Sequence, residues 1–425
     1  MTTVSPTGAA SLSCDVLVIG GGAAGVAAAA AAGRAGARVV LLERYGFWGG
    51  LATTAQVGNA CGLYLRDTSQ AEPLLVADGF VRDFAQRLRA AGGLEPLRLN
   101  PGLWVLPFPI PVFWSVADAL LRESGNITMV LHATVAGAQT EGPRVVQVSG
   151  LAWSEPLSVR PAAVVDCSGE ATVAGLAGAP VENGIADQVP ALIFTLEQVD
   201  AALTECGLLE VRREVRRAVE NGVLPASCEH LAIVPGTNAN GRMALKLNLS
   251  PAASDRPLWQ QVTAWEREAR GLAVELHRFL VSNTASCRQA RLASIAPQLG
   301  LRSGMRIQGR ATLTDQDVLG SRKHASGIAR GCWPMERWGS SARPEMGFFN
   351  ERDYYEIPLD CLRPTNLDNL FAAGRCLSAA SRAMTSARVI GTALATGWAA
   401  GTAAAFQALG QPLEEAVAAI RRQMG

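Results

Sequence analysis

The sequence predicts an α/β fold: a parallel sheet, extended by a small antiparallel meander, with an inserted α+β domain. Three observations predict it. An apolar strand, a glycine-rich turn and an alanine-rich helical segment follow one another between residues 15 and 34. A second succession of strand, turn and helix begins at residue 369. Between the two, from Asn183 onward, helices and strands alternate in a different pattern. Strands that alternate with helices favour a parallel sheet.

The first element is a strand over residues 16–19, followed by Gly20, Gly22 and Gly25 at GxGxxG spacing and by a helix over residues 26–32. Gly20 permits a tight turn, Gly22 lets the backbone approach a pyrophosphate, and Gly25 lets the helix pack close to the strand. The N-terminus of such a helix offers N–H groups and a positive dipole end to phosphates. These residues therefore favour a phosphate-binding turn.

The second strand, over residues 38–42, ends at Glu43. A carboxylate about 20 residues after the glycine turn can accept hydrogen bonds from a ribose diol, and it would repel a 2′-phosphate. The glycines alone are a weak signal, but strand, turn, helix and acid in this order are a much stronger one. The stretch therefore predicts a dinucleotide site at which NADP is not expected.

The composition limits the classes of function. The chain has 425 residues and a formal charge of +1 from 38 basic and 37 acidic residues, and this balance argues against a nucleic-acid-binding protein. Nine cysteines without a CxxC pair indicate reduced thiols in a cytoplasmic protein and no zinc-type metal site. Lys246 and Lys323 are the only lysines.

Two stretches bear on targeting. Residues 1–13 are small and polar and lack the pattern of a leader, so we expect a frayed tail. Residues 389–409 are uncharged and long enough to span a membrane. They are rich in Ala, Gly and Thr, however, and Gly397 and Gly401 would let a helix pack tightly against a sheet or a cofactor. We therefore expect a buried helix and no membrane association.

The loop over residues 44–50 is rich in glycine and aromatic residues. Gly49 and Gly50 allow a second close approach of the backbone, as needed where a long dinucleotide bends toward its reactive ring. Cys61 fits either a redox-active thiol or, more commonly, a small packed side chain.

The elements expected next are a helix over 76–91, an extended proline-rich stretch over 104–114 and a helix over 116–123. Meander strands are expected over 127–138, 144–153 and 157–160. A buried strand over 162–166 then leads into Cys167, Ser168, Gly169 and Glu170.

The domain boundaries follow from the change of pattern. We expect residues 184–343 to form the inserted substrate domain, and residues 1–183 and 344–425 to form a discontinuous dinucleotide-binding domain. The elements expected in the insert are strands over 189–196 and 243–249 and helices over 211–221 and 258–282. The elements expected after it are strands over 354–360 and 369–373, a turn at Gly374 and Arg375, a loop, and a long helix from about Ser386.

With these motifs, the chain resembles the FAD-dependent oxidoreductases of the two-dinucleotide-binding-domain type, with the glutathione-reductase-like FAD fold. Within them it is most similar to the bacterial FAD dependent oxidoreductase family related to the fumarate reductase and L-aspartate oxidase flavoproteins. The matching stretches are DVLVIGGGAAG with RVVLLER, FWGGLATT, AAVVDCSGEATVAGLAGAP, PQLGLRSGMRIQGRATLT and the run from YYEIPLD to GTAAA. The resemblance spans nearly the whole chain and implies an oxidoreductase with FAD as its cofactor.

The resemblance also implies a set of FAD-binding residues. The pyrophosphate would lie on the glycine turn, the ribose on Glu43, and the adenine on the backbone of Val135. The pyrimidine end of the flavin would face the N-terminus of the last long helix, where Arg388 adds a positive charge that favours the reduced ring. The full set is Gly20, Gly22, Ala23, Ala24, Gly25, Glu43, Arg44, Gly49, Gly50, Leu51, Ala52, Val135, Ser168, Gly169, Gly374, Arg375, Arg388, Val389 and Ile390.

One family stretch is altered. Members often carry the cluster Arg-Glu-Ser/Thr-Arg-Arg in the inserted domain, and here the chain reads Arg302-Ser303-Gly304-Met305-Arg306. An acid and a basic residue are lost. Substrate contacts of the family at this place therefore do not carry over.

Catalytic residues are harder to identify, because a hydride can pass to flavin N5 without a protein base. His324, in a polar loop, is the candidate base and, with Arg388, makes up the predicted catalytic set. His132 and His277 are expected to be structural or exposed. The candidates for bidentate binding of a substrate carboxylate, each of which also fits a surface charge, are Arg310, Arg343 and Arg382.

Three functions fit the sequence. The first is an enzyme that oxidises or desaturates a small metabolite, or reduces it in reverse, by hydride transfer at flavin N5. The second is non-oxidative or group-transfer flavin chemistry, as in flavin-dependent RNA-modifying enzymes, against which the neutral charge and the lack of a basic tract count. The third is a flavoprotein subunit that passes electrons to a partner chain. The expected partner is a small-molecule substrate, with no nucleic acid and no membrane, and a homo-oligomer stays open.

Overall fold

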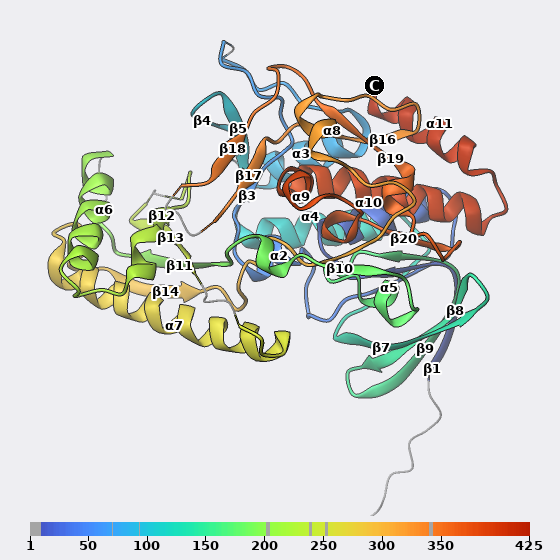
Figure 1. Ribbon diagram of the computed structural model, residues 1–425, viewed down its shortest axis with the longest axis horizontal. Helices are drawn as coiled ribbons and strands as arrows, with labels where there is room; N and C mark the ends of the chain where they lie inside the picture. The colour runs from blue at the N-terminus through green and yellow to red at the C-terminus, as the bar shows by residue number, and fades with distance from the viewer. Residues whose placement is uncertain are drawn as a thin grey trace, which may run out of the picture.

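A computed structural model describes residues 10–69, 71–92, 94–200, 205–237, 240–250, 254–339 and 343–425 (Figure 1). Its main sheet has seven strands in the order β6-β2-β1-β9-β8-β7, with β20 also paired to β9. β6, β2, β1, β9 and β20 run parallel, whereas β8 and β7 add an antiparallel extension, so the predicted fold class is confirmed. The strands are β1 (Ala10–Ile19), β2 (Val39–Leu42), β6 (Ile127–Val130), β7 (Ala133–Glu141), β8 (Arg144–Ala152), β9 (Glu155–Asp166) and β20 (Leu370–Ala372).

The meander differs from the prediction in two places. Residues 127–138 form two strands, because His132 takes a left-handed backbone conformation with φ 55° and separates β6, which pairs parallel with β2, from β7. Residues 155–166 form the single strand β9, since β1 pairs with it from Leu157 to Asp166. The expected tail is also shorter, because β1 begins at Ala10; residues 1–9 lie outside the described residues.

The register of the parallel strands brings their carboxyl ends to one edge of the sheet. Ile19 lies opposite Leu42 on β2 and opposite Asp166 on β9, and Asp166 lies opposite Ala372 on β20. The residues that follow these four strands must therefore lie near one another. In open α/β sheets, ligands bind at this edge.

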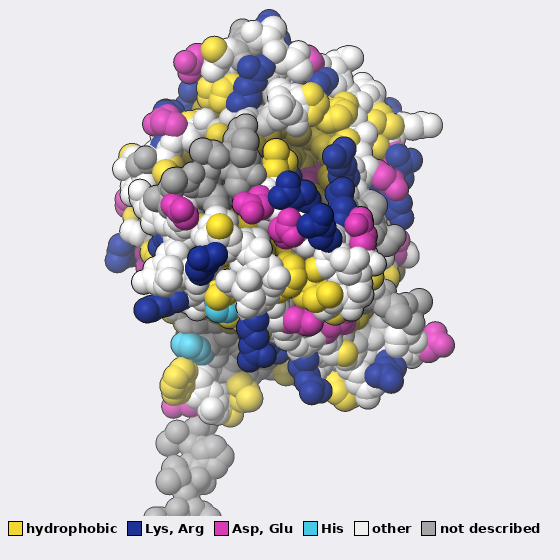
Figure 2. Space-filling model, turned by 90° about the vertical axis from the view of Figure 1, so that its left-hand side faces the viewer, with side chains coloured by type: hydrophobic (Ala, Val, Ile, Leu, Met, Phe, Trp, Pro, Cys, Tyr) yellow, Lys and Arg dark blue, Asp and Glu magenta, His cyan; other side chains and the backbone are white. Residues whose placement is uncertain are grey.

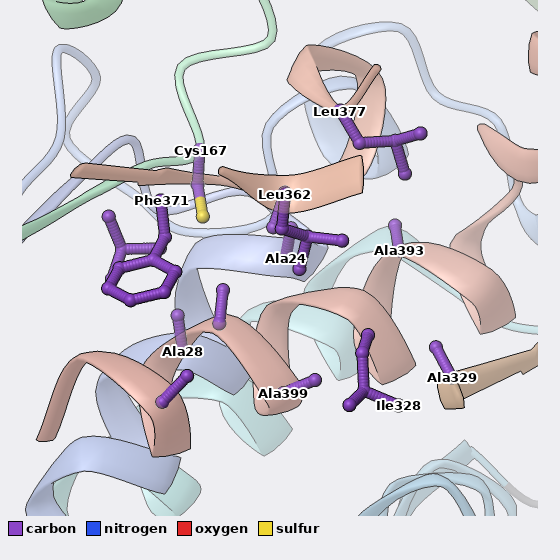
Figure 3. Close-up of a cluster of buried hydrophobic side chains, with 14 of the residues drawn as sticks. Ala24, Ala28, Cys167, Ile328, Ala329, Leu362, Phe371, Leu377, Ala393 and Ala399 are labelled. Atoms are coloured by element: carbon purple, nitrogen blue, oxygen red, sulfur yellow. The ribbon is translucent and has the colours of Figure 1, made fainter. Parts of the chain in front are cut away.

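Helices α1 and α10 pack against the main sheet and lie in direct backbone contact with each other. A Cβ atom at Gly397 would overlap the carbonyl oxygen of Ala24, and one at Gly401 would overlap that of Ala28. These glycines therefore do permit tight packing, but the partner is helix α1 and not the predicted sheet or cofactor. Figure 3 shows alanines of both helices in one buried cluster with Phe371. The helices around the main sheet are α1 (Ala23–Arg34), α2 (Leu51–Thr54), α3 (Gly79–Gly92), α4 (Ile110–Glu123), α5 (Thr172–Leu176), α8 (Asp315–Leu319), α9 (Ser381–Ala387), α10 (Ile390–Ala408) and α11 (Leu413–Met424).

Several helix starts differ from the prediction, and two of them have a local physical cause. The long C-terminal helix begins at Ile390 and not near Ser386, because Val389 is extended and the preceding residues form α9, bent by 92° from α10. Helix α4 begins at Ile110 inside the proline-rich stretch, since Pro111 occupies its first turn, where a missing N–H costs nothing.

No single helix among the described residues combines the length and apolar character needed to cross a bilayer. The bent pair α9 and α10 meets the criterion of length and composition only when both are taken together. Most of α10 is buried inside the protein.

The second unit packs a four-stranded antiparallel sheet against two helices, at the left of Figure 1. Leu192, Phe194 and Leu196 alternate along β11 and point into a core with Leu272 and Leu276 of α7. This core extends from Ile185 to Leu301, whereas residues from Leu313 onward pack into the core of α1 and α10. The predicted boundaries at 184 and 343 stay a prediction. The elements are β11 (Ala191–Glu197), α6 (Glu205–Glu220), β12 (Leu231–Ile233), β13 (Arg242–Asn248), α7 (Leu258–Asn283) and β14 (Arg291–Ile295).

Small sheets of two or three strands accompany the two larger sheets. Acidic and basic side chains are interspersed on the face that carries α6 and α7 (Figure 2). Of the small strands, β3, β4, β5 and β17 contribute residues to the lining of the site described next. The small strands are β3 (Asn59–Ala60), β4 (Leu97–Leu99), β5 (Leu103–Pro107), β10 (Val181–Asn183), β15 (Met305–Ile307), β16 (Gly327–Gly331), β17 (Met335–Arg337), β18 (Glu345–Gly347) and β19 (Tyr355–Pro358), and the 3-10 turns span Ile185–Asp187, Ala226–His230, Leu359–Leu362 and Gly374–Cys376.

Candidate functional site

A cavity of about 590 Å³ begins at the carboxyl ends of β1, β2, β9 and β20 and continues to the second unit. Its volume is within the range usual for small-molecule and cofactor sites. It is lined by all of the predicted cofactor-binding residues except Gly25. The lining therefore joins segments from both ends of the chain and from the unit between them.

The glycine turns form a wall of bare backbone. Gly20 leaves β1 with φ 90°, and a Cβ atom there would lie 2.7 Å from the carbonyl oxygen of Cys167. Gly22 forms a β-bridge with Gly49, and a Cβ at Gly50 would lie 3.0 Å from Cα of Gly22. Gly25 packs against the carbonyl of Gly20 instead of lining the cavity. A ligand can thus approach two backbone segments without meeting a side chain.

The N-terminus of α1 opens onto this wall. Gly22 is its N-cap residue and provides no side-chain hydrogen bond, and the first turn contains no acidic residue. The N–H groups of the first turn are therefore left for a ligand, and the helix dipole favours an anion there. A pyrophosphate has the charge and the acceptor oxygens to fill this cradle.

Glu43 lies at the carboxyl end of β2 and is only 4 % exposed. One carboxylate oxygen accepts the N–H of Gly21 at 2.6 Å, and the other accepts that of Tyr45 at 2.9 Å. Burial raises the pKa of this carboxyl, whereas the two N–H donors favour its ionised form. Each oxygen keeps a lone pair, so the carboxylate can also accept hydrogen bonds from a ribose diol.

A buried network fixes the turn after β9. Asp166 accepts the N–H groups of Val173 and Ala174 at 2.8 and 3.0 Å and the hydroxyl of Ser168 at 2.6 Å. Burial raises the pKa of this aspartate. Ser168 and Gly169 are thereby held at the cavity wall, next to the end of β20.

The segment after β20 supplies the opposite wall. The N–H of Gly374 donates to the hydroxyl of Thr396 at 3.2 Å, which ties this turn to α10. The guanidinium of Arg375 donates to the carbonyl of Leu301 and lies 3.4 Å from the carboxylate of Glu170. Val389 and Ile390, at the N-terminus of α10, complete this side, and Val389 caps the helix without a side-chain hydrogen bond.

The end of the cavity formed by the second unit and β17 carries charged side chains that sequence reasoning did not select. Lys246 extends from β13, and Glu336 extends from β17 between Trp333 and Trp338. The oxygens of Glu336 accept the indole N–H groups of both tryptophans, each at 2.8 Å. The only signal in the sequence was the rarity of lysine, which carries no information about position.

Burial shifts the pKa values of the titratable groups at this end. The pKa of Lys246 is lowered to about 8, mainly by burial and next by neighbouring Arg302, while Glu336 opposes the change. Burial also lowers the pKa of Arg302, to about 9, and that of Arg388. The Cys61 thiol, which lines the same end, has its pKa raised to about 12 by burial, so it stays protonated and unreactive at neutral pH.

Besides Gly25, four predicted catalytic and substrate residues lie outside the lining. His324 precedes β16, where its N–H donates to Glu356 and its ring nitrogen lies 3.8 Å from Asp317. The structure therefore does not bring the candidate base to the cavity. The prediction was wrong because the residue type alone does not tell where in the fold a loop lies. The three candidate substrate arginines lie elsewhere too: Arg310 pairs with Asp368 at 2.7 Å, Arg382 lies 4.0 Å from Asp315, and Arg343 is exposed. Of the predicted catalytic set, only Arg388 lines the cavity.

Comparisons with known proteins bear on the cofactor. A family model described as FAD dependent oxidoreductase matches residues 15–419. A comparison with curated proteins gives no match.

Among solved structures, the chain is similar to a geranylgeranyl bacteriochlorophyll reductase-like protein from Thermoplasma acidophilum, with 14 % identity, a TM-score of 0.47, and 97 % of this chain and 84 % of that chain covered. It is similar to a flavin-dependent brominase with 14 % identity, a TM-score of 0.48, and coverage of 96 % and 83 %. It is also similar to an aromatic hydroxylase from angucycline biosynthesis with 13 % identity, a TM-score of 0.47, and coverage of 97 % and 65 %.

Proposed function

Because the chain belongs to the FAD dependent oxidoreductase family, FAD is its cofactor, and we propose that it oxidises or desaturates a small metabolite, or reduces it in the reverse direction. The isoalloxazine ring supplies the redox chemistry, by hydride transfer at N5. The protein supplies position, charge and the exclusion of water. The residues of the cavity are suited to these roles of the protein.

One observation carries the proposal: two helix N-termini, without side-chain caps, meet at a single cavity walled by bare glycine backbone. The N-terminus of α1 suits the pyrophosphate, and Glu43 suits the adenosine ribose. The N-terminus of α10 lies at the other wall, beside Arg388. A helix N-terminus and a fixed cation there stabilise negative charge on the pyrimidine side of a bound flavin.

Substrate has room beyond the flavin, where the second unit closes the cavity. Ile193 and Val234 contribute apolar surface there, and Trp333 and Trp338 are both buried. An apolar wall excludes water from the reacting atoms, which strengthens every charge interaction inside. The proposal assigns the substrate to this end of the cavity.

The test begins with the cofactor. The purified protein should be yellow, and acid precipitation should release FAD into the supernatant. FMN alone, or no flavin after reconstitution, would refute an FAD site.

Anaerobic screening of metabolites for bleaching of the flavin absorbance should then identify substrates. Admission of air distinguishes an oxidase from an enzyme that needs a partner acceptor. A flavin that no metabolite in the screen bleaches or reoxidises would count against the hydride-transfer reaction.

A further inference from the structure

The end of the cavity between β13 and β17 has more positive charge than its own residues neutralise. We propose that it binds the carboxylate of a small organic acid, and that Lys246 provides the ammonium that contacts this carboxylate. The inference rests on the proposed function, because it names the substrate class of the same site. It assigns a role to a residue that lies outside the glycine and helix-terminus machinery.

The alternation of β13 directs Lys246 toward the cavity. Met243, Leu245 and Leu247 point into the core shared with α6 and α7, so the residues between them occupy the other face of the sheet. Lys246 pairs across the sheet with Ile193 of β11, which also lines the cavity. The position of the ammonium is therefore set by the strand register and not by a mobile loop.

The ammonium of Lys246 has no acceptor among the described residues. Its contact is the face of the Trp338 indole, with Nζ 4.1 Å from the ring centroid. No hydrogen bond or ion pair joins it to another residue in the described part of the chain. An ammonium has three donors, and a half-buried charge without acceptors is costly unless a ligand supplies them.

The two neighbouring arginines have neutral partners. Arg302 lies over the same indole, with Cζ 4.8 Å from the ring centroid, and donates to the carbonyl of Val189 and, at 2.7 Å, to the side-chain oxygen of Asn248. Arg388 lies 3.3 Å from the side-chain amide of Gln188. These partners fix the two guanidinium groups without neutralising them.

Glu336 is the carboxylate of this end, and it cannot balance three cations. Its oxygens are held by two indole N–H groups, so it contributes one negative charge against those of Lys246, Arg302 and Arg388. The pyrophosphate of FAD belongs at the glycine turn, at the far end of the cavity. A reduced flavin accounts for one of the two excess positive charges, and an anionic substrate accounts for the other.

The lining residues near Lys246 indicate which kind of anion fits this end of the cavity. Ile193, Val234 and Val105 are buried apolar residues in the lining, so the body of the ligand is apolar. An ammonium with free donors beside ordered guanidinium groups suits the planar oxygens of a carboxylate. The ligand is thus a carboxylic acid with an apolar body, bound with its carboxylate toward Trp338.

Matched acids and amides test the charge requirement on the FAD-loaded protein. Binding is measured by the perturbation of the flavin absorbance spectrum. The probes are acetate and acetamide, benzoate and benzamide, phenylacetate and phenylacetamide, and hexanoate and hexanamide. At least one acid should bind about tenfold or more tightly than its amide, because the two differ in charge and hardly in shape. Equal binding of every pair, or no perturbation by any acid at tens of millimolar, would overturn the inference.

Variants assign the effect to Lys246. In Lys246→Met the dissociation constant of the acid should rise about tenfold to a hundredfold while that of the amide changes little, and Lys246→Arg should recover part of the loss. The chain offers a matched control in Lys323→Met, since Lys323 is exposed and pairs with Asp353 at 2.7 Å. An unchanged acid affinity in Lys246→Met would refute the role of this lysine.

Flavin content separates this inference from the proposed function. Acid release of FAD is measured for each variant before the titrations, and should be the same in all of them. Loss of FAD from every preparation would refute the FAD site itself. Full FAD occupancy without a preference for acids would refute only the substrate class.

Discussion

Lys246 carries a charge that its surroundings disfavour. Burial lowers the pKa of this ammonium to about 8, with Arg302 as the next cause, from a usual value of about 10.4. The pKa can be measured directly, because the chain has only two lysines. Reductive methylation with ¹³C-formaldehyde should give two dimethyl-lysine signals, and Lys246→Arg identifies one of them. That signal should titrate near pH 8.

The same shift predicts a sign for stability. Between pH 8 and 10 the unfolded chain binds a proton at Lys246 that the folded chain has released, so this group makes the free energy of unfolding rise with pH across that window. A titration of the Lys246 signal at or above pH 10.4 would contradict both statements. The comparison of Lys246→Met with wild type isolates the contribution of this residue.

Glu43 holds two backbone N–H groups and retains acceptor capacity for the cofactor. In Glu43→Gln one oxygen becomes an amide that faces the N–H of Gly21 or Tyr45, and the charge is lost. A hydrogen bond to a charged group contributes roughly 1.5–3 kcal/mol, so the dissociation constant of FAD should rise about tenfold to a hundredfold. Flavin fluorescence titration of the apoprotein measures it.

The control is Glu141→Gln, at an exposed position in the hairpin between β7 and β8. It should bind FAD as wild type does. If Glu43→Gln also keeps wild-type affinity, the ribose is held elsewhere.

Residues differed in how well the sequence predicted them. Gly20, Gly22 and Glu43 line the cavity as expected, because a local motif specifies their geometry within a few residues. Lys246 and Glu336 come together only through the register of β13 and the fold of β17, which no local pattern reveals. His324 was chosen by residue type and lies outside the cavity, since a histidine in a polar loop carries no positional signal.

At the scale of elements, α10 depends on two glycines for its place against α1. In Gly401→Ala the new methyl group would overlap the carbonyl of Ala28, so the free energy of unfolding should fall by about 1–3 kcal/mol although alanine favours helix. Gly271→Ala in α7 is the matched control, because nothing lies within contact of a Cβ there. The control should be stabilised by up to about 1 kcal/mol, as alanine exceeds glycine in helix propensity. Urea unfolding measures both, and equal effects would contradict the packing.

The break between α9 and α10 places Arg388 beside the N-terminus of α10. Arg388→Met removes a cation from the pyrimidine side of the proposed flavin position, and should lower its reduction potential by tens of millivolts, at roughly 30 mV for each 1.4 kcal/mol. Dye-equilibrated redox titration against Arg267→Met, an exposed position on α7, provides the comparison. An unchanged or raised potential would show that Arg388 does not act on the ring.

The strands and long helices were mostly predictable, because apolar runs and alanine-rich stretches report local preference. The starts of α4 and α10 were not, since Pro111 is tolerated in a first turn and the extended conformation at Val389 depends on packing. The continuity of β9 was missed for a similar reason: both of its halves pair with β1, which is distant in the sequence.

Across the whole molecule, the cavity draws its walls from both parts of the fold, so ligand binding should stabilise both together. FAD at a hundred times its dissociation constant should raise the free energy of unfolding by about 2.7 kcal/mol, as one transition. Riboflavin, which lacks the pyrophosphate and the adenosine, should produce a much smaller rise at equal concentration. A riboflavin effect equal to that of FAD would mean that the glycine turn and Glu43 contribute nothing.

The contact between α1 and α10 has a consequence for how the protein is made. The glycine turn and Glu43 leave the ribosome early, whereas Gly374 and α10 emerge only near the end of translation. A nascent chain therefore holds half a cradle, with the face of α1 that later meets Gly397 and Gly401 exposed. The complete set of cavity walls exists only after α10 has been synthesised, so we expect FAD to bind after translation and not during it.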